Sequence, residues 1–137
     1  MACKDKTITI GNSDVYARQW PASLALENLS RLLRTFGNNA DGFIAGDYVF
    51  RDCMQALYTE KHKEVVQLIQ QFCMAARTDG KEIKSTVEFD QLYSGDLQRV
   101  FKVFSFVCEL NYKDFFDSGV TPPEPDPAQE TPETTQP

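Results

Sequence analysis

The feature that most constrains the fold is a run of apolar side chains at helical spacing near the start of the chain. Between Pro21 and Gly37, apolar residues recur three or four positions apart. This spacing predicts an amphipathic helix with one buried face, begun by the proline and ended by the glycine. The predicted buried side consists of Ala25, Leu29, Leu32, Leu33 and Phe36, and the predicted solvent side of Glu27, Asn28, Arg31 and Arg34.

Three further stretches, at about 47–57, 60–76 and 95–117, have the same spacing and predict three more helices. Residues 38–47 between them are rich in turn formers and predict a loop, and Gly119 is expected to end the last helix. Residues 78–90 break the helical pattern, and short extended pieces are expected there around Ile83 and Val87. The inward residues are predicted to be Val49, Phe50, Cys53, Met54 and Leu57; then Val65, Leu68, Ile69, Phe72 and Cys73; then Val100, Phe101, Phe104, Val107, Cys108 and Phe115.

The segment before the first helix favours extended structure. Residues 7–18 contain β-branched and aromatic residues on both sides of Gly11 and Asn12, which predicts a short β-hairpin. Two strands alone are marginally stable, so the hairpin must pack on the helices, with Trp20 as a contact between the hairpin and the first helix. The predicted fold class is therefore mainly α (α+β): a single domain over residues 1–119, with an N-terminal hairpin packed on about four helices.

The composition changes sharply at Val120. Six of the seven prolines and four acidic residues lie in 121–137, which contain no lysine or arginine. Such a segment buries too little apolar surface to offset the entropy lost on ordering. Residues 120–137 are predicted to form a flexible acidic tail, partly in the polyproline II conformation.

Charge and cysteine content exclude several classes of protein. A net charge of −6 argues against a nucleic-acid-binding protein and against attraction to an anionic membrane surface. No signal peptide is expected in residues 1–10, and no stretch has the roughly 18 apolar residues of a membrane span. We expect a soluble protein whose cysteines remain reduced, because their spacing matches neither a zinc site nor a disulfide framework. These are Cys3, Cys53, Cys73 and Cys108.

The sequence shows little sign of catalysis. The single histidine, His62, is surrounded by Lys and Glu residues typical of a solvated helical turn. The carboxylate pairs Asp114/Asp117 and Glu88/Asp90 are of the kind that charged helix faces routinely produce. No glycine-rich phosphate loop is present, and no cofactor or metal is predicted.

The late phenylalanines raise a separate question. Successive helical residues differ by about 100°, so the phenylalanines of the last helix cannot all face one way. Phe106 and Phe116 are predicted to point away from the buried face. Each then either packs on the hairpin or forms part of a surface for a partner. The predicted partner-binding residues are Phe106, Tyr112, Phe115 and Phe116.

Several short motifs occur in an informative order. They are an ITIG-type hairpin at Ile8–Gly11, a helix ending LLxxFG at Pro21–Gly37, the turn TDGK at Thr78–Lys81, FDxxYSGD at Phe89–Asp96, and FKxFxFxxELNYxDFF at Phe101–Phe116. Together they resemble the tail assembly chaperones of tailed bacteriophages. Residues 38–60 carry no such motif.

The resemblance implies a non-enzymatic protein in the cytoplasm of the bacterial host. Such chaperones bind the tape measure protein, help to recruit tail tube subunits around it, and leave before the virion is complete. They commonly occur in a short form and a longer frameshifted form. Two alternatives stay open: a minor structural protein of a phage tail or baseplate that remains in the virion, and a small enzyme built around His62 or the Asp114/Asp117 pair.

Overall fold

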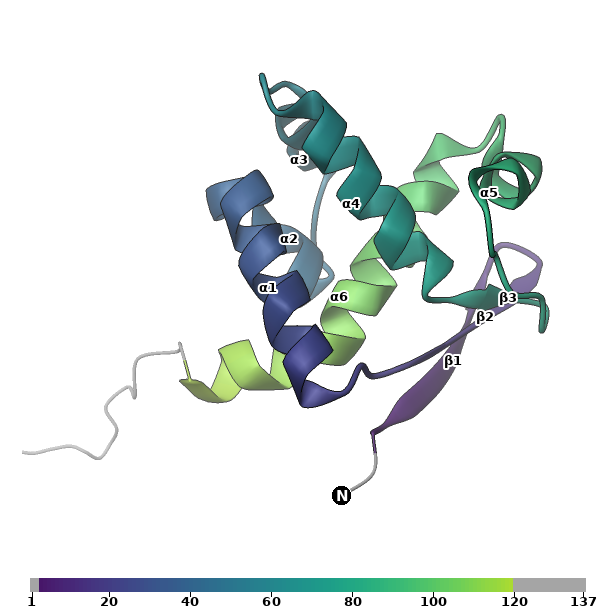
Figure 1. Cartoon of the computed structure of the whole chain (residues 1–137), viewed down its shortest axis with the longest axis horizontal. Coiled ribbons are helices and arrows are strands. Elements are labelled where there is room, and N and C mark those ends of the chain that lie inside the picture. The colour runs from purple at the N-terminus through teal and green to yellow at the C-terminus, as the bar shows by residue number, and fades with distance from the viewer. Residues whose placement is uncertain (1–2, 120–137) are drawn as a thin grey trace, which may run out of the picture.

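The computed structural model of the chain describes residues 3–119 (Figure 1). The predicted acidic tail, residues 120–137, lies outside the described residues. A small sheet packs beside a group of helices, so the prediction of a mainly α fold with an N-terminal hairpin is confirmed. In chain order the elements are β1 (Asp5–Ile10), β2 (Ser13–Arg18), α1 (Ala22–Phe36), the 3-10 turn η1 (Gly37–Asn39), α2 (Ala40–Ala45), α3 (Phe50–Leu57), α4 (His62–Met74), β3 (Arg77–Thr78), α5 (Thr86–Tyr93) and α6 (Leu97–Gly119).

The hairpin forms as predicted and gains a third strand. β1 and β2 are antiparallel with Ile8 opposite Val15, and the two-residue connection is possible because Gly11 adopts a φ of 62°. β3 then pairs antiparallel with the outer side of β2. The sheet is held to α6 by polar contacts at the end of β2, where the backbone N–H of Trp20 donates to the Asn111 side chain at 2.9 Å.

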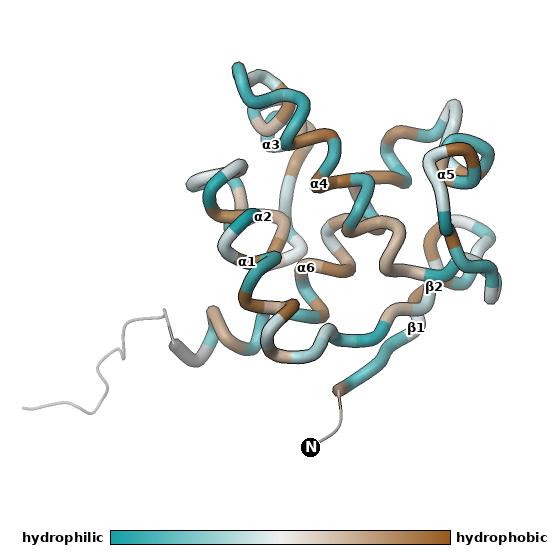
Figure 2. The backbone as a smooth tube through the Cα atoms, viewed as in Figure 1, coloured by the Kyte–Doolittle hydropathy of each residue, from teal (hydrophilic) through white to brown (hydrophobic). Residues whose placement is uncertain are grey.

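Helix α6 crosses the middle of the molecule and contacts the sheet, α2, α4 and α5 (Figure 1). Hydrophobic segments of α4 and α6 meet at the centre (Figure 2). The core there is largely aromatic. The ring of Phe104 lies 5.2 Å from Phe36, 5.4 Å from Phe43 and 5.4 Å from Phe72, measured between centroids. Trp20 extends this cluster by packing edge-on against Phe72 at 4.9 Å, so it joins α4 as well as the hairpin and α1.

Two of the predicted helices have the predicted faces with few changes. All five predicted inward residues of α4 are buried, and α1 ends at Gly37, whose φ is 57°. Two side chains of α1 depart from the prediction. Asn28 is buried, and its side-chain oxygen accepts a hydrogen bond of 3.2 Å from the Arg31 guanidinium, which offsets the cost of burying it. Leu33 is 41% exposed.

The predicted loop at 38–47 is wrong, because it contains the helix α2. Its side chains Ala40, Phe43 and Ile44 are buried against α6, and this packing outweighs the turn propensity of the asparagines and glycines around them. The turn formers instead mark its ends: Gly46 follows α2 with a φ of 80°. A side chain there would also lie within 3.1 Å of the Glu109 carboxylate.

The extended structure predicted at 78–90 is also wrong for Val87, which lies in the helix α5. Ser85 caps this helix by accepting a hydrogen bond from the backbone N–H of Glu88 at 3.3 Å. The Glu88 carboxylate in turn accepts from the backbone N–H of Lys84 at 2.6 Å. This reciprocal cap is encoded by a Ser followed three residues later by Glu, a signal that was present in the sequence.

Candidate protein-binding surface

Helix α3 exposes the side chains that its sequence pattern predicts to be buried. Phe50 is 77% exposed, Met54 53% and Leu57 40%, and Tyr58 directly after the helix is 92% exposed. The prediction of an inward face is therefore wrong for Phe50, Met54 and Leu57, and also for Val49, which is 60% exposed; it is correct only for Cys53. Positions 50, 54 and 57 share one side of the helix, since residues three and four apart are neighbours on a helix surface, and Tyr58 follows them directly. We name Phe50, Met54, Leu57 and Tyr58 the α3 apolar stripe.

The orientation of α3 follows from its small residues. Cys53 and Ala56 face the body, and burial raises the pKa of the Cys53 thiol, with the Asp52 carboxylate adding to the shift. At the start of the helix, Asp52 accepts a hydrogen bond from the backbone N–H of Val49 at 2.9 Å. The same carboxylate would lie only 3.2 Å from a Cβ placed on Gly42 of α2. Contact through small residues brings α3 close to the body and turns its bulky side chains to solvent.

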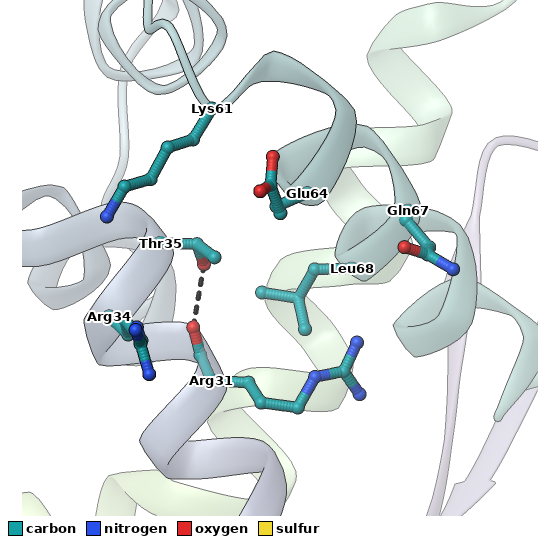
Figure 3. A pocket seen from close by; sticks show the side chains of 7 residues that line it. All are labelled: Arg31, Arg34, Thr35, Lys61, Glu64, Gln67 and Leu68. Atoms are coloured by element: carbon teal, nitrogen blue, oxygen red, sulfur yellow. Dashed lines mark hydrogen bonds between the residues drawn. The ribbon is translucent and has the colours of Figure 1, made fainter.

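A groove lies between α1 and the start of α4 (Figure 3). It encloses about 300 Å³, and the buried side chain of Leu68 is part of its lining. Arg31 and Arg34 enter it from α1, and Lys61 from the residue before α4, with its ammonium end directed toward α1 in Figure 3. The hydroxyl of Thr35 is turned back into the helix, where it donates to the carbonyl oxygen of Arg31 at 2.8 Å. We name this the basic groove.

The basic groove is positive in an otherwise acidic chain. It presents three cations and one carboxylate, Glu64, whereas the whole chain has a net charge of −6. Within residues 3–119, no carboxylate lies within ion-pair distance of Arg31, Arg34 or Lys61. The α3 apolar stripe and the basic groove adjoin at Lys61, which lines the groove and also a depression lined by Leu57 and Tyr58.

A surface of this kind suits protein binding, and the comparison with protein families agrees. The family described as phage tail assembly chaperone protein, TAC, matches residues 11–122. The chain belongs to this family. No curated protein and no solved structure matched the chain.

The match covers the structure of the chaperone from the hairpin turn through α6. It therefore includes both the α3 apolar stripe and the basic groove. It also includes residues 38–60, where the sequence shows no motif of the family.

The four predicted partner-binding residues lie in different environments. Phe106 is buried beside the hairpin, where it lines a depression with Lys4 and Gln19, so packing on the hairpin is the alternative that the structure supports. Tyr112 is buried as well, and its hydroxyl donates to the carbonyl oxygen of Ala25 at 2.8 Å. Phe116 is partly buried against the core, and its ring meets that of Phe115 at 5.6 Å.

Phe115 is 57% exposed, so its predicted place on the buried face is wrong. It lies eleven positions after Phe104 and on the same side of α6, so the spacing predicts its side of the helix correctly. The end of α6, however, extends past α1 and has little of the body beside it (Figure 1). Of the four candidates, Phe115 remains the most accessible to a partner.

The residues weighed for catalysis are scattered over the chaperone. His62 is exposed at the first position of α4, Glu88 caps α5, and Asp114 lies 3.4 Å from the Lys4 ammonium. Among residues 3–119, no three His, Cys, Asp or Glu side chains form a group that could hold a metal ion. None of the helices described there is long and apolar enough to cross a membrane.

Sequence spacing could not reveal the binding surface. The apolar pattern of α3 is the same whether its bulky residues face a core or a partner. One signal was present: the pattern holds two small residues, Cys53 and Ala56, on one side and large residues on the other. In the structure α3 contacts α4 and η1, and Cys53 and Ala56 are its buried side chains.

Proposed function

We propose that this chaperone binds the phage tape measure protein during tail assembly and helps to recruit tail tube subunits around it. It acts in the cytoplasm of the host, without enzymatic activity. The partners come from the resemblance to tail assembly chaperones. The observation that supports a binding role is the α3 apolar stripe, in which the helix directs Phe50, Met54 and Leu57 to solvent and Tyr58 is exposed directly after it.

Burial of the stripe against a partner would contribute favourable free energy to binding. Burying one large apolar side chain contributes about 1.5–3 kcal/mol. Aromatic residues and methionine are enriched at protein interfaces, and the flexible methionine side chain adapts to partners of different shape. A helical segment of a tape measure protein would bury its own apolar face on this stripe and would be kept from aggregating.

Co-expression with the cognate tape measure protein tests the proposal. The unmodified chain is expected to increase the soluble fraction of the tape measure protein and to co-purify with it. The variant F50D/M54D should lose both effects, whereas V87D should retain them, because Val87 is a similarly exposed apolar residue on α5. If the tape measure protein is equally insoluble with and without the chain, the proposal is wrong.

A further inference from the structure

We infer that the α3 apolar stripe and the basic groove together bind one amphipathic helix whose apolar face is bordered by carboxylate side chains. This inference rests on the proposed function, since it specifies the chemistry of the bound segment. It also makes a separate claim, because a tape measure protein could be bound through apolar contacts alone.

The length of the stripe indicates that the groove belongs to the same surface. From Phe50 to Tyr58 the stripe runs about 12 Å, at about 1.5 Å per residue. A helix of average length, about 11–12 residues, is roughly 17 Å long and would extend beyond it. Lys61 lines both the depression at Leu57 and Tyr58 and the basic groove, so a helix that lies on the stripe and extends past Tyr58 reaches Lys61 at the border of the groove.

The charges determine which helix fits there. Arg34 and Lys61 are exposed. Arg31 is half-buried, and one of its guanidinium nitrogens donates a hydrogen bond to the Asn28 side chain. None of the three forms an ion pair within residues 3–119. Carboxylates along one border of a partner helix would form ion pairs with these three cations, whereas lysines at the same positions would be repelled by them. The acidic remainder of the chain repels the same carboxylates, so the groove also sets the orientation of the helix.

The chain itself contains a competing source of carboxylates. Glu124, Asp126, Glu130 and Glu133 follow α6 in the sequence and could supply anions to the groove. They lack apolar side chains at helical spacing, however, and therefore do not match the stripe. For this reason we assign the surface to a partner helix and treat the chain's own carboxylates as an outcome of the test.

The test compares three synthetic peptides of about 18 residues, long enough to form helix in isolation. All share one leucine stripe, and the positions bordering it are Glu, Gln or Lys. Binding to the full chain is measured by fluorescence anisotropy of labelled peptide. The Glu peptide is expected to bind at least about tenfold more tightly than the Lys peptide, because several exposed ion pairs each contribute a factor of a few. The preference should weaken as salt is raised.

Charge-reversal variants of the chain test whether the basic groove causes the preference for the Glu peptide. The charge reversals R34E/K61E should remove the preference for the Glu peptide, and R31E/R34E/K61E should invert it. The double variant changes only exposed side chains, so it gives a result even where the triple variant unfolds. K81E is the matched control, because Lys81 is an exposed cation that does not line the groove. A further variant of the full chain, E124Q/D126N/E130Q/E133Q, should leave affinity for the Glu peptide unchanged within about twofold.

Three results of the peptide experiment would overturn the inference: equal affinity for all peptides, an equal effect of K81E and R34E/K61E, or a several-fold gain in affinity when the four C-terminal carboxylates are neutralised. The last result would assign the groove to the chain's own carboxylates. The inference and the proposed function fail separately. If R34E/K61E solubilises the cognate tape measure protein as well as the unmodified chain does, the inference is wrong and the function stands. If the unmodified chain binds the Glu peptide but not the tape measure protein, the function is wrong.

Discussion

The hydroxyl group of Ser105, in the middle of α6, donates a hydrogen bond of 2.8 Å to the carbonyl oxygen of Phe43 in α2. Both residues are buried, and the bond fixes the position of a short helix that the sequence pattern does not predict. It satisfies a carbonyl near the end of α2, where helical carbonyl groups lack partners within their own helix.

Ser105→Ala should therefore destabilise the fold by about 1–2 kcal/mol, since a buried carbonyl would lose its partner. The measurement is urea unfolding followed by the fluorescence of Trp20, the one tryptophan of the sequence. The midpoint should fall and the slope should stay unchanged. Ser30→Ala, at an exposed position of α1, is the control and should not lower the midpoint. Equal midpoints for Ser105→Ala and the unmodified chain would show that the hydrogen bond contributes nothing.

Phe43→Ala and Phe50→Ala should differ strongly, although both replace phenylalanine in a helix. The Phe43 ring is fully buried among Phe36, Phe104 and Tyr48, and its loss should cost about 3–5 kcal/mol. Phe50 is 77% exposed, and its loss should change the free energy of unfolding by no more than about 0.5 kcal/mol. A large destabilisation by Phe50→Ala would mean that α3 packs with its bulky face inward.

The contrast between these two phenylalanines shows what the sequence could predict. The spacing in α1 and α4, and in α6 as far as Cys108, largely indicates the buried faces correctly, because long helices across a core need one continuous apolar side. It fails at α2, where six residues make fewer than two helical turns and packing of Ala40, Phe43 and Ile44 stabilises the helix. It fails at α3 for a different reason: the period is right, but small residues make the contact with the body.

The end of α6 offers a second matched pair. Phe116→Ala should destabilise the fold, because Phe116 packs against the core, by about 1–3 kcal/mol. Phe115→Ala should cost less than about 1 kcal/mol, because this side chain is mostly exposed. Thermal unfolding of both variants provides the comparison. If Phe115→Ala is the more destabilising of the two, the last turns of α6 pack differently from the arrangement described.

Stability should fall at alkaline pH. Burial raises the pKa of Tyr93 to about 12, from an ordinary value near 10. Between pH 10 and 12 the folded chain keeps this proton while the unfolded chain loses it, so unfolding becomes easier by at most about 1.4 kcal/mol per pH unit. Below about pH 9 the contribution is constant. Burial also raises the pKa of Cys73, Cys108 and Tyr112, which adds to the loss.

The variant Tyr93→Phe isolates one part of this effect. The free energy of unfolding, measured by urea titration at intervals from pH 8 to pH 11, should decline less steeply in the variant than in the unmodified chain. Identical declines in the two chains would show that Tyr93 titrates alike in the folded and unfolded states.

The central claim is that α3 meets the tape measure protein, and site-specific photocrosslinking tests it most directly. A photoreactive phenylalanine analogue is placed at position 50 of the full chain, or at Val87 as an exposed control, and each chain is co-expressed with the cognate tape measure protein. Irradiation should yield a covalent adduct with the tape measure protein from position 50 and none from position 87. An adduct from position 87 alone, or from neither position while the two proteins still co-purify, would contradict the claim.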